Sequence, residues 1–190
     1  MSTRKRFIAT GDMVLVAMFA ALMAIGANLT SFLVIGSVPI TLQTLFSILA
    51  GALLGSRLGA LAMTVYLFVG LAGFPVFAQF RGGLSTLLSP NFGFLLSYLL
   101  VAFVTGLIIE KSRTKALRTF LIACFTGLVI NYVFGTHYMY YAFQFLAGLE
   151  AISYQLAWAW MAAPFVKDTI LTIFAAILSR RMYGVIRKRA

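Results

Sequence analysis

The sequence contains little negative charge and few reactive side chains. Its 190 residues include four acidic residues, one histidine and one cysteine, against fifteen lysines and arginines. The acids and the histidine are scattered over different segments and form no recognisable catalytic constellation, so we predict neither a metal site nor a cofactor. The lone cysteine, Cys124, cannot form an intrachain disulfide and lies in an apolar run, where we expect it to pack.

Several functional motifs are also missing. The chain has no Walker A sequence, so it cannot power transport by itself through that phosphate cradle. It has no HExxH motif and no GxSxG elbow. These absences argue against an enzyme.

Apolar residues, by contrast, dominate the composition. They make up 62% of the chain, charged residues make up 10%, and the mean hydropathy is +1.01. A soluble domain of this size could not bury so much apolar surface, so we predict an all-α integral membrane protein surrounded by lipid. The net charge of +11 would suit a nucleic-acid partner, but the basic residues lie in short segments between apolar runs, so we expect no nucleic acid.

The apolar runs predict six transmembrane helices in a single domain that covers residues 1–190. A helix that crosses the hydrocarbon core needs about 20 apolar residues. The N-terminus imitates a signal peptide, but its apolar run continues to about residue 35, as in a retained first helix. The six predicted spans are 13–35, 40–56, 58–78, 92–110, 117–136 and 155–179. The aromatic region 136–156 is too polar for a clean crossing, and we expect it at the outer surface.

The basic residues favour one orientation in the membrane. If the six helices alternate in direction, 13 of the 15 basic residues fall on one side, which predicts that both termini face the cytoplasm. The two exceptions are Arg81 and Lys167, and Lys167 is followed directly by Asp168. An ionisable group in a membrane span costs on the order of 2.5–3.5 kcal/mol, so such a group needs a partner or a purpose. These three residues are therefore our first site candidates.

Each of the three has a simpler interpretation. Arg81 could extend to lipid headgroups. Asp168 could form a salt bridge with Lys167 or Arg81 that only neutralises buried charge.

Pro164 fits the first turn or a kink of a helix, and an aspartate just beyond it could accept two hydrogen bonds from the N–H groups of a neutral ligand.

The interruption between the third and fourth spans, residues 73–93, holds further candidates. It contains two of the four prolines and offers Gln79, Arg81 and Asn91 around the pair Gly82 and Gly83. Glycines permit close approach to a ligand and the movement of a lid, and the arginine fork suits a carboxylate. In the preceding run, glycines at 51, 55, 59, 70 and 73 indicate close helix packing. Gln43 either binds a ligand or caps the start of its helix.

Small residues also mark the first span. Ala17 and Ala21 form one pair four residues apart, and Ala20 and Ala24 form another on a neighbouring face. Such surfaces dock another helix in lipid, from the same chain or from a partner.

Four stretches resemble the BioY family, the biotin-specific S components of energy-coupling-factor (ECF) transporters. They are VPITLQTLFSILAGALLGSRLGALAMTVYLFVGLAGFPVFAQFRGG, LLSPNFGF, YVFG and PFVKD. The resemblance implies a six-helix S-component bundle with no enzymatic activity, which binds biotin at its outer face under a lid made by the loops after the first and third spans. It also implies a membrane partner subunit and two ATPase subunits, in a bacterial plasma membrane.

The resemblance further implies roles for individual residues. Asp168 would accept the two ureido N–H groups of biotin, and Arg81 or Lys167 would meet its carboxylate. Gln43 and the stretch 79–83 fall where the family builds its pocket and lid, and Phe77, Phe80 and Tyr132 would cover the apolar ring and chain. The alanine pairs resemble the surface that docks on the membrane subunit. Many members carry a lysine three residues after the aspartate, where this chain has Leu171.

Three other functions compete with biotin binding. An S component for another vitamin, such as thiamine or riboflavin, would share the fold and the partner surface and differ in its pocket. An intramembrane enzyme could use Asp168 with Lys167 or His137, although the catalytic motifs are missing. A membrane scaffold would use the alanine pairs only to assemble partners.

Overall fold

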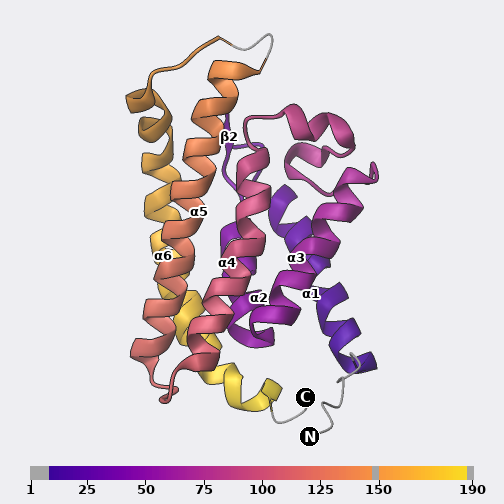
Figure 1. The fold of residues 1–190 in the computed structure, drawn as a ribbon, viewed down its shortest axis with the longest axis vertical. Helices are drawn as coiled ribbons and strands as arrows, with labels where there is room; N and C mark the ends of the chain where they lie inside the picture. The colour runs from indigo at the N-terminus through magenta and orange to yellow at the C-terminus, as the bar shows by residue number, and fades with distance from the viewer. Residues whose placement is uncertain (1–8, 147–149, 188–190) are drawn as a thin grey trace, which may run out of the picture.

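The computed structural model of the chain describes residues 9–146 and 150–187, with backbone only for 185–187. Six α-helices form an elongated bundle in which consecutive helices run in opposite directions, so the start of α1 and the end of α6 lie at the same end (Figure 1). The helices are α1 (Thr10–Asn28), α2 (Gln43–Leu54), α3 (Ser56–Leu71), α4 (Phe92–Lys111), α5 (Leu117–Phe145) and α6 (Tyr154–Arg187). The prediction of an all-helical chain is confirmed.

Short elements cover the opposite end of the bundle, which we call the hairpin end (Figure 1). Strands β1 (Val34–Ile35) and β2 (Val38–Pro39) form an antiparallel hairpin in which Ile35 faces Val38. Two 3₁₀ turns, η1 (Ala78–Phe80) and η2 (Leu84–Leu88), lie in the connection between α3 and α4. The hairpin turns at Gly36, whose φ is +59°, and a Cβ there would lie 2.3 Å from the Trp160 ring. The hairpin is therefore held closely against α6.

Helix α2 is the central helix of the bundle. It contacts each of the other five helices, and Phe46 is the one of its twelve residues that is not buried. Twelve residues rise about 18 Å, which is less than the thickness of the hydrocarbon core. Because protein surrounds α2 on all sides, the helix does not need to span the lipid by itself, and its N-terminus ends inside the bundle.

Close backbone contacts explain the glycines around α2. A Cβ on Gly51 would lie 2.2 Å from the carbonyl oxygen of Ala102 on α4, so only glycine allows the two helices to approach this closely. Gly55 adopts a φ of +88° and makes the turn between α2 and α3. The interpretation of Gly51 as a close-packing position is therefore confirmed, whereas Gly55 serves as a turn residue.

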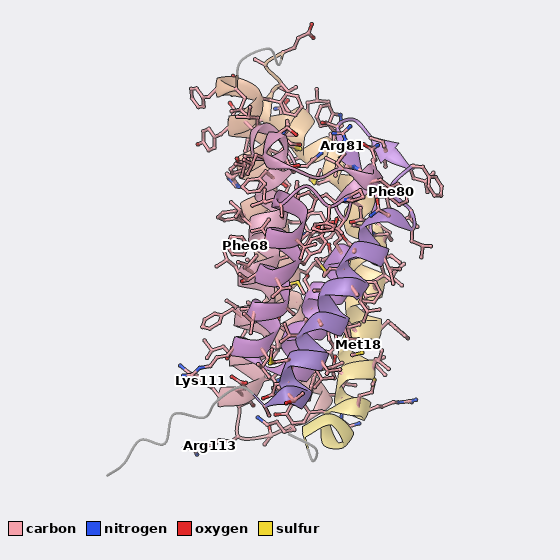
Figure 2. The ribbon with its side chains drawn as sticks, turned by 90° about the vertical axis from the view of Figure 1, so that its right-hand side faces the viewer. Met18, Phe68, Phe80, Arg81, Lys111 and Arg113 are labelled. Atoms are coloured by element: carbon pink, nitrogen blue, oxygen red, sulfur yellow. The ribbon has the colours of Figure 1, made fainter. Side chains whose placement is uncertain are left out.

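Four helices, α1, α4, α5 and α6, are long and apolar enough to cross a membrane, while α2 and α3 are shorter apolar helices. Large apolar side chains also face outward; Met18 on α1 and Phe68 on α3, for example, project from the middle of the bundle (Figure 2). Such a surface would be costly in water and is favourable in lipid. The chain is a membrane protein.

Several predicted boundaries were wrong, and one of them is the end of α6, which continues to Arg187 instead of ending at 179. Helix α1 ends at Asn28 instead of 35, because the chain turns there into the β-hairpin. Helix α3 ends at Leu71 instead of 78, since Gly73 adopts a φ of +107° that a helix does not accommodate. The region 136–156 is largely helical, because α5 continues to Phe145 and α6 begins at Tyr154. Rings from the two helices pack together there, with the centroids of Tyr140 and Tyr154 5.4 Å apart.

Pro164 lies well inside α6 and does not begin it, so Lys167 and Asp168 are more than three turns from the start of that helix. Helix α6 therefore carries both side chains into the bundle, away from its end.

Basic residues gather at the end opposite the hairpin, which we call the basic end: Lys111 and Arg113 lie there, and Arg81 lies at the hairpin end (Figure 2).

Candidate functional site

A cavity opens at the hairpin end of the bundle. The space between protein atoms there amounts to about 790 Å³, part of which is open to the surroundings. Its wall combines the β-hairpin, the start of α2, the α3–α4 connection and the upper parts of α4, α5 and α6. Among the predicted site residues, those that line it are Gln43, Phe77, Gln79, Arg81, Asn91, Tyr132, Lys167 and Asp168.

Asp168 is the buried acidic group of this cavity, with an exposed fraction of 4%. The Tyr132 hydroxyl donates a hydrogen bond to its Oδ2 at 2.8 Å, and Lys167 Nζ lies 2.9 Å from its Oδ1. Lys167 Nζ also donates to the carbonyl oxygen of Thr41, just before α2. A carboxylate has about four lone-pair positions, so Asp168 retains acceptor capacity towards the cavity.

Gln43 is the first residue of α2 and lines the cavity, but its side chain does not cap the helix, because Leu42 holds the N-cap position without a side-chain hydrogen bond. Its exposed fraction is 3%, and its Nε2 donates to the Tyr66 hydroxyl at 2.9 Å. The Tyr66 hydroxyl in turn donates to the carbonyl oxygen of Val76 at 3.1 Å. This chain of hydrogen bonds connects the start of α2 to the α3–α4 connection.

Six polar cavity residues were not among the predicted ligand-binding residues: Thr41, Thr44, Thr86, Ser89, Tyr98 and Asn131. Asn131 is 2% exposed, accepts a hydrogen bond from Ser97 Oγ at 2.8 Å and donates to Thr44 Oγ1 at 3.4 Å. Polar side chains inside apolar runs were the available signal, because each needs a buried partner. Sequence alone does not reveal that α2, α4 and α5 turn the side chains of Thr44, Ser97 and Asn131 toward one another.

The α3–α4 connection contributes both lining and supporting residues. Phe77 is buried and packs edge-on against Tyr66, while Asn91 Nδ2 donates to the carbonyl oxygen of Ser37 in the hairpin at 2.7 Å. Gly82 and Gly83 do not line the cavity. Gly82 instead packs against the Phe74 backbone, and the Gly83 N–H donates to the carbonyl oxygen of Gly70 at 2.7 Å.

Two further aromatic or basic candidates lie outside the cavity. Phe80 is 70% exposed and points away from it. His137 approaches the Val133 carbonyl oxygen and the Tyr154 hydroxyl, and its ring packs against Trp158. Within residues 9–146 and 150–187, no three His, Cys, Asp or Glu side chains lie close enough to hold a metal ion.

Comparison with known proteins identifies the family. The model of the BioY family matches residues 1–188. The chain belongs to the BioY family. A relative in Bacillus subtilis (strain 168), named putative biotin transporter BioYB, is 42% identical over 97% of this chain and 94% of its own length. The biotin transporter BioY of Rhizobium etli is 35% identical over 91% and 93% of the two chains.

A solved structure shares the fold of this BioY-family chain. It is a crystal structure of the S component for biotin from an ECF-type ABC transporter. The TM-score is 0.80, and the match covers 97% of this chain and 95% of the other at 22% sequence identity. The bundle thus has the S-component fold.

The two alanine pairs of the BioY-family chain differ in exposure. Ala17 and Ala21 are exposed on α1, whereas Ala20 is buried and Ala24 packs against the core. The first pair is therefore open to a helix outside the bundle, and the second pair contributes to packing within it.

Proposed function

We propose that this chain is the biotin-binding S component of an ECF-type vitamin importer in a bacterial plasma membrane. In this proposal all six helices form the transmembrane bundle, in which the short α2 spans only part of the lipid thickness, and both termini face the cytoplasm. The placement of Lys111 and Arg113 at the end opposite the cavity supports this orientation, because cytoplasmic ends carry the positive charge (Figure 2). The cavity would then open to the outside, where it could capture the vitamin.

The observation that carries the proposal is the buried Asp168 at the wall of a cavity lined by both polar and apolar side chains. The ureido ring of biotin presents two N–H donors, and a carboxylate with spare lone pairs accepts both. Tyr132 and Lys167 hold this carboxylate in place, so it needs no reorganisation when ligand binds. Phe77, with Phe94 and Leu95, would surround the apolar part of the ligand.

Arg81 is the better of the two partners for the biotin carboxylate. Lys167 is already engaged by Asp168 and by the carbonyl oxygen of Thr41. Over the described part of the chain, Arg81 forms no ion pair, although it lines the cavity. Its planar fork suits a carboxylate that enters last, near the mouth. Gln79 and Asn91, which also line the cavity, would contribute neutral contacts beside it.

Transport would depend on partners. The chain lacks a Walker A sequence, so the energy would come from two ATPase subunits through a membrane subunit. The exposed pair Ala17 and Ala21 is the proposed docking surface for that membrane subunit. The names of the relatives, which describe transporters, support a transport subunit and not an enzyme.

Thermal unfolding of the purified chain with biotin tests the proposal. A ligand at 100 times its dissociation constant stabilises the native state by about 2.7 kcal/mol. Biotin should therefore raise Tm, and Asp168→Asn should abolish the shift. Asp12→Asn is the matched control: it removes one carboxylate at the opposite end of the bundle and should leave the shift intact.

Competition distinguishes biotin from another vitamin. Unlabelled biotin should displace bound radioactive biotin, whereas thiamine and riboflavin should not. If thiamine or riboflavin raises Tm while biotin does not, the substrate assignment fails and the S-component fold remains. If no vitamin changes Tm, a scaffold that only assembles partners becomes the better explanation.

A further inference from the structure

A tight turn at residues 77–81 has an unusual backbone. The Phe77 N–H donates to the carbonyl oxygen of Arg81 at 2.9 Å, which closes the turn. At its corner, Gln79 and Phe80 have φ values of +61° and +55°. Residues with a Cβ rarely adopt this left-handed region, and two in succession persist only where the surroundings enforce them.

Side chains that follow or end α1 enforce this conformation. The Phe80 N–H donates to Asn28 Oδ1 at 2.7 Å, and the Gln79 N–H donates to Ser31 Oγ at 3.1 Å. Asn28 Nδ2 approaches the carbonyl oxygen of Val76 at 3.4 Å, so one amide group contacts both sides of the turn. Ser31 is 3% exposed and donates to the backbone carbonyl oxygen of Asn28 at 3.3 Å, which holds the Ser31 side chain at the end of α1.

The conformation of the turn decides which of its side chains reach the cavity. Phe77, Gln79 and Arg81 line the cavity, while Phe80 is 70% exposed. Without the left-handed residues the chain would not reverse at this point, and Gln79 and Arg81 would not both face inward. Asn28 and Ser31 do not line the cavity themselves.

We propose that Asn28 and Ser31 are positioning residues that clamp the 77–81 turn, so that Gln79 and Arg81 face the ligand and the ligand is released slowly. The proposal rests on the proposed function for the identity of the ligand, biotin. The clamp itself can be measured without any ligand, so the two ideas can fail separately.

Three substitutions separate the contributions to the clamp. Asn28→Leu keeps the size of the side chain and removes its hydrogen bonds, whereas Asn28→Asp keeps the acceptor for the Phe80 N–H. Ser31→Ala removes the acceptor for the Gln79 N–H and tests the clamp independently if Asn28→Leu does not fold. Gln144→Leu is the matched control, because Gln144 donates to the Ile152 carbonyl oxygen in the α5–α6 connection and does not line the cavity.

The first measurement is amide hydrogen exchange of the ligand-free chain, read on peptides that cover the turn. Asn28→Leu and Ser31→Ala should speed exchange at Gln79 and Phe80 by about tenfold, since each variant frees an amide that was hydrogen-bonded. Asn28→Asp and Gln144→Leu should match the unsubstituted chain. Exchange in α4 and α5 should stay unchanged, which a general loss of stability would not allow. Unchanged exchange at the turn in both Asn28→Leu and Ser31→Ala would overturn the proposal.

The second measurement is the dissociation rate of biotin. Asn28→Leu should raise this rate by about tenfold, and Asn28→Asp should restore it to within about threefold of the original value. Asn28→Leu could speed amide exchange at the turn and yet leave the dissociation rate of biotin unchanged. In that case the clamp does not hold Gln79 and Arg81 against the ligand, and the inference fails. If the unsubstituted chain does not bind biotin, the proposed function fails, and the exchange data still decide whether the clamp exists.

Discussion

The hydroxyl group of Tyr132 on α5 donates a hydrogen bond of 2.8 Å to the carboxylate of Asp168 on α6. The ring of Tyr132 packs edge-on against Phe165 at a centroid distance of 5.2 Å, which fixes its direction. Lys167 neutralises the same carboxylate from its other oxygen. Two helices and three side chains thus prepare one acceptor group at the wall of the cavity.

Tyr132→Phe should weaken biotin binding by about tenfold, because it removes a hydrogen bond to a charged group and keeps the ring. Isothermal titration with biotin measures the change. Tyr154→Phe should leave the affinity unchanged, since that hydroxyl contacts His137 outside the cavity. Equal affinities for the Tyr132 variant and the unsubstituted chain would remove Tyr132 from the site.

Lys167→Met should destabilise the ligand-free chain by on the order of 2 kcal/mol. It would leave the buried Asp168 without its cation, which costs roughly 3–5 kcal/mol in a fully buried pair. The loss is smaller here because the Lys167 side chain is 27% exposed. Thermal unfolding measures the effect, and adding Asp168→Asn should recover part of it. A double variant less stable than either single variant would contradict this account.

Arg81→Gln should remove the preference for the biotin acid over its neutral amide. A charge-assisted bond contributes about 1.5–3 kcal/mol, so the unsubstituted chain should prefer the acid by about tenfold or more. Competition binding with both compounds measures the ratio. The opposite result, a preference that survives Arg81→Gln and disappears in Lys167→Gln, would assign the carboxylate to Lys167.

Gly51→Val should abolish folding or lower Tm strongly, because a Cβ there would lie 2.2 Å from the backbone oxygen of Ala102. The helices would have to separate, and packing between α2 and α4 would be lost. Gly184→Ala is the control, since nothing lies within 4 Å of the Cβ position in that helix. A stable, monodisperse Gly51→Val variant would show that α2 and α4 are less closely packed than described.

Cysteine labelling should reveal the orientation in the membrane. Cys124 is fully buried and should react slowly with a membrane-impermeant maleimide, so it provides a low background. In intact cells, Phe145→Cys at the end of α5 should be labelled, because α5 ends at the hairpin end (Figure 1). Arg113→Cys at the basic end should react only after the membrane is opened (Figure 2). Labelling of Arg113→Cys in intact cells would reverse the proposed topology.

Helix positions were predictable where a long apolar run met a clear stop. Helix α4 agrees with the prediction to within one residue, because Pro90 and Asn91 precede it and Lys111 ends it. The ends of α1 and α3 were predicted too late, since the apolar residues beyond them belong to a hairpin and to a turn and not to a helix. Hydropathy measures how strongly a residue prefers lipid or the protein interior to water. It does not distinguish an apolar residue in a transmembrane helix from one in a hairpin or a turn that packs on the bundle.

Some residues of the candidate site could also be predicted from the sequence, and others could not. Asp168 could be predicted because a lone acid in an apolar run is costly and needs a reason. Asn131 and Thr44 were missed as cavity residues, since their roles depend on how α2 and α5 are rotated about their axes. Gly82 and Gly83 support the backbone of the α3–α4 connection instead of contacting the cavity.

The sequence by itself determined that the chain is a helical membrane protein of the BioY family with its positive charge at one end, because transfer free energies and charge depend on local composition. Only the tertiary structure decided that Lys167 is committed to Asp168 while Arg81 lines the cavity without an ion pair among the described residues. It also decided that Asn28 supports the turn at Phe80. Lys167 and Asp168 are neighbours in the sequence, so their ion pair depends on the side-chain directions that packing allows. Asn28 and Phe80 are 52 residues apart, and only packing brings their atoms within hydrogen-bond distance.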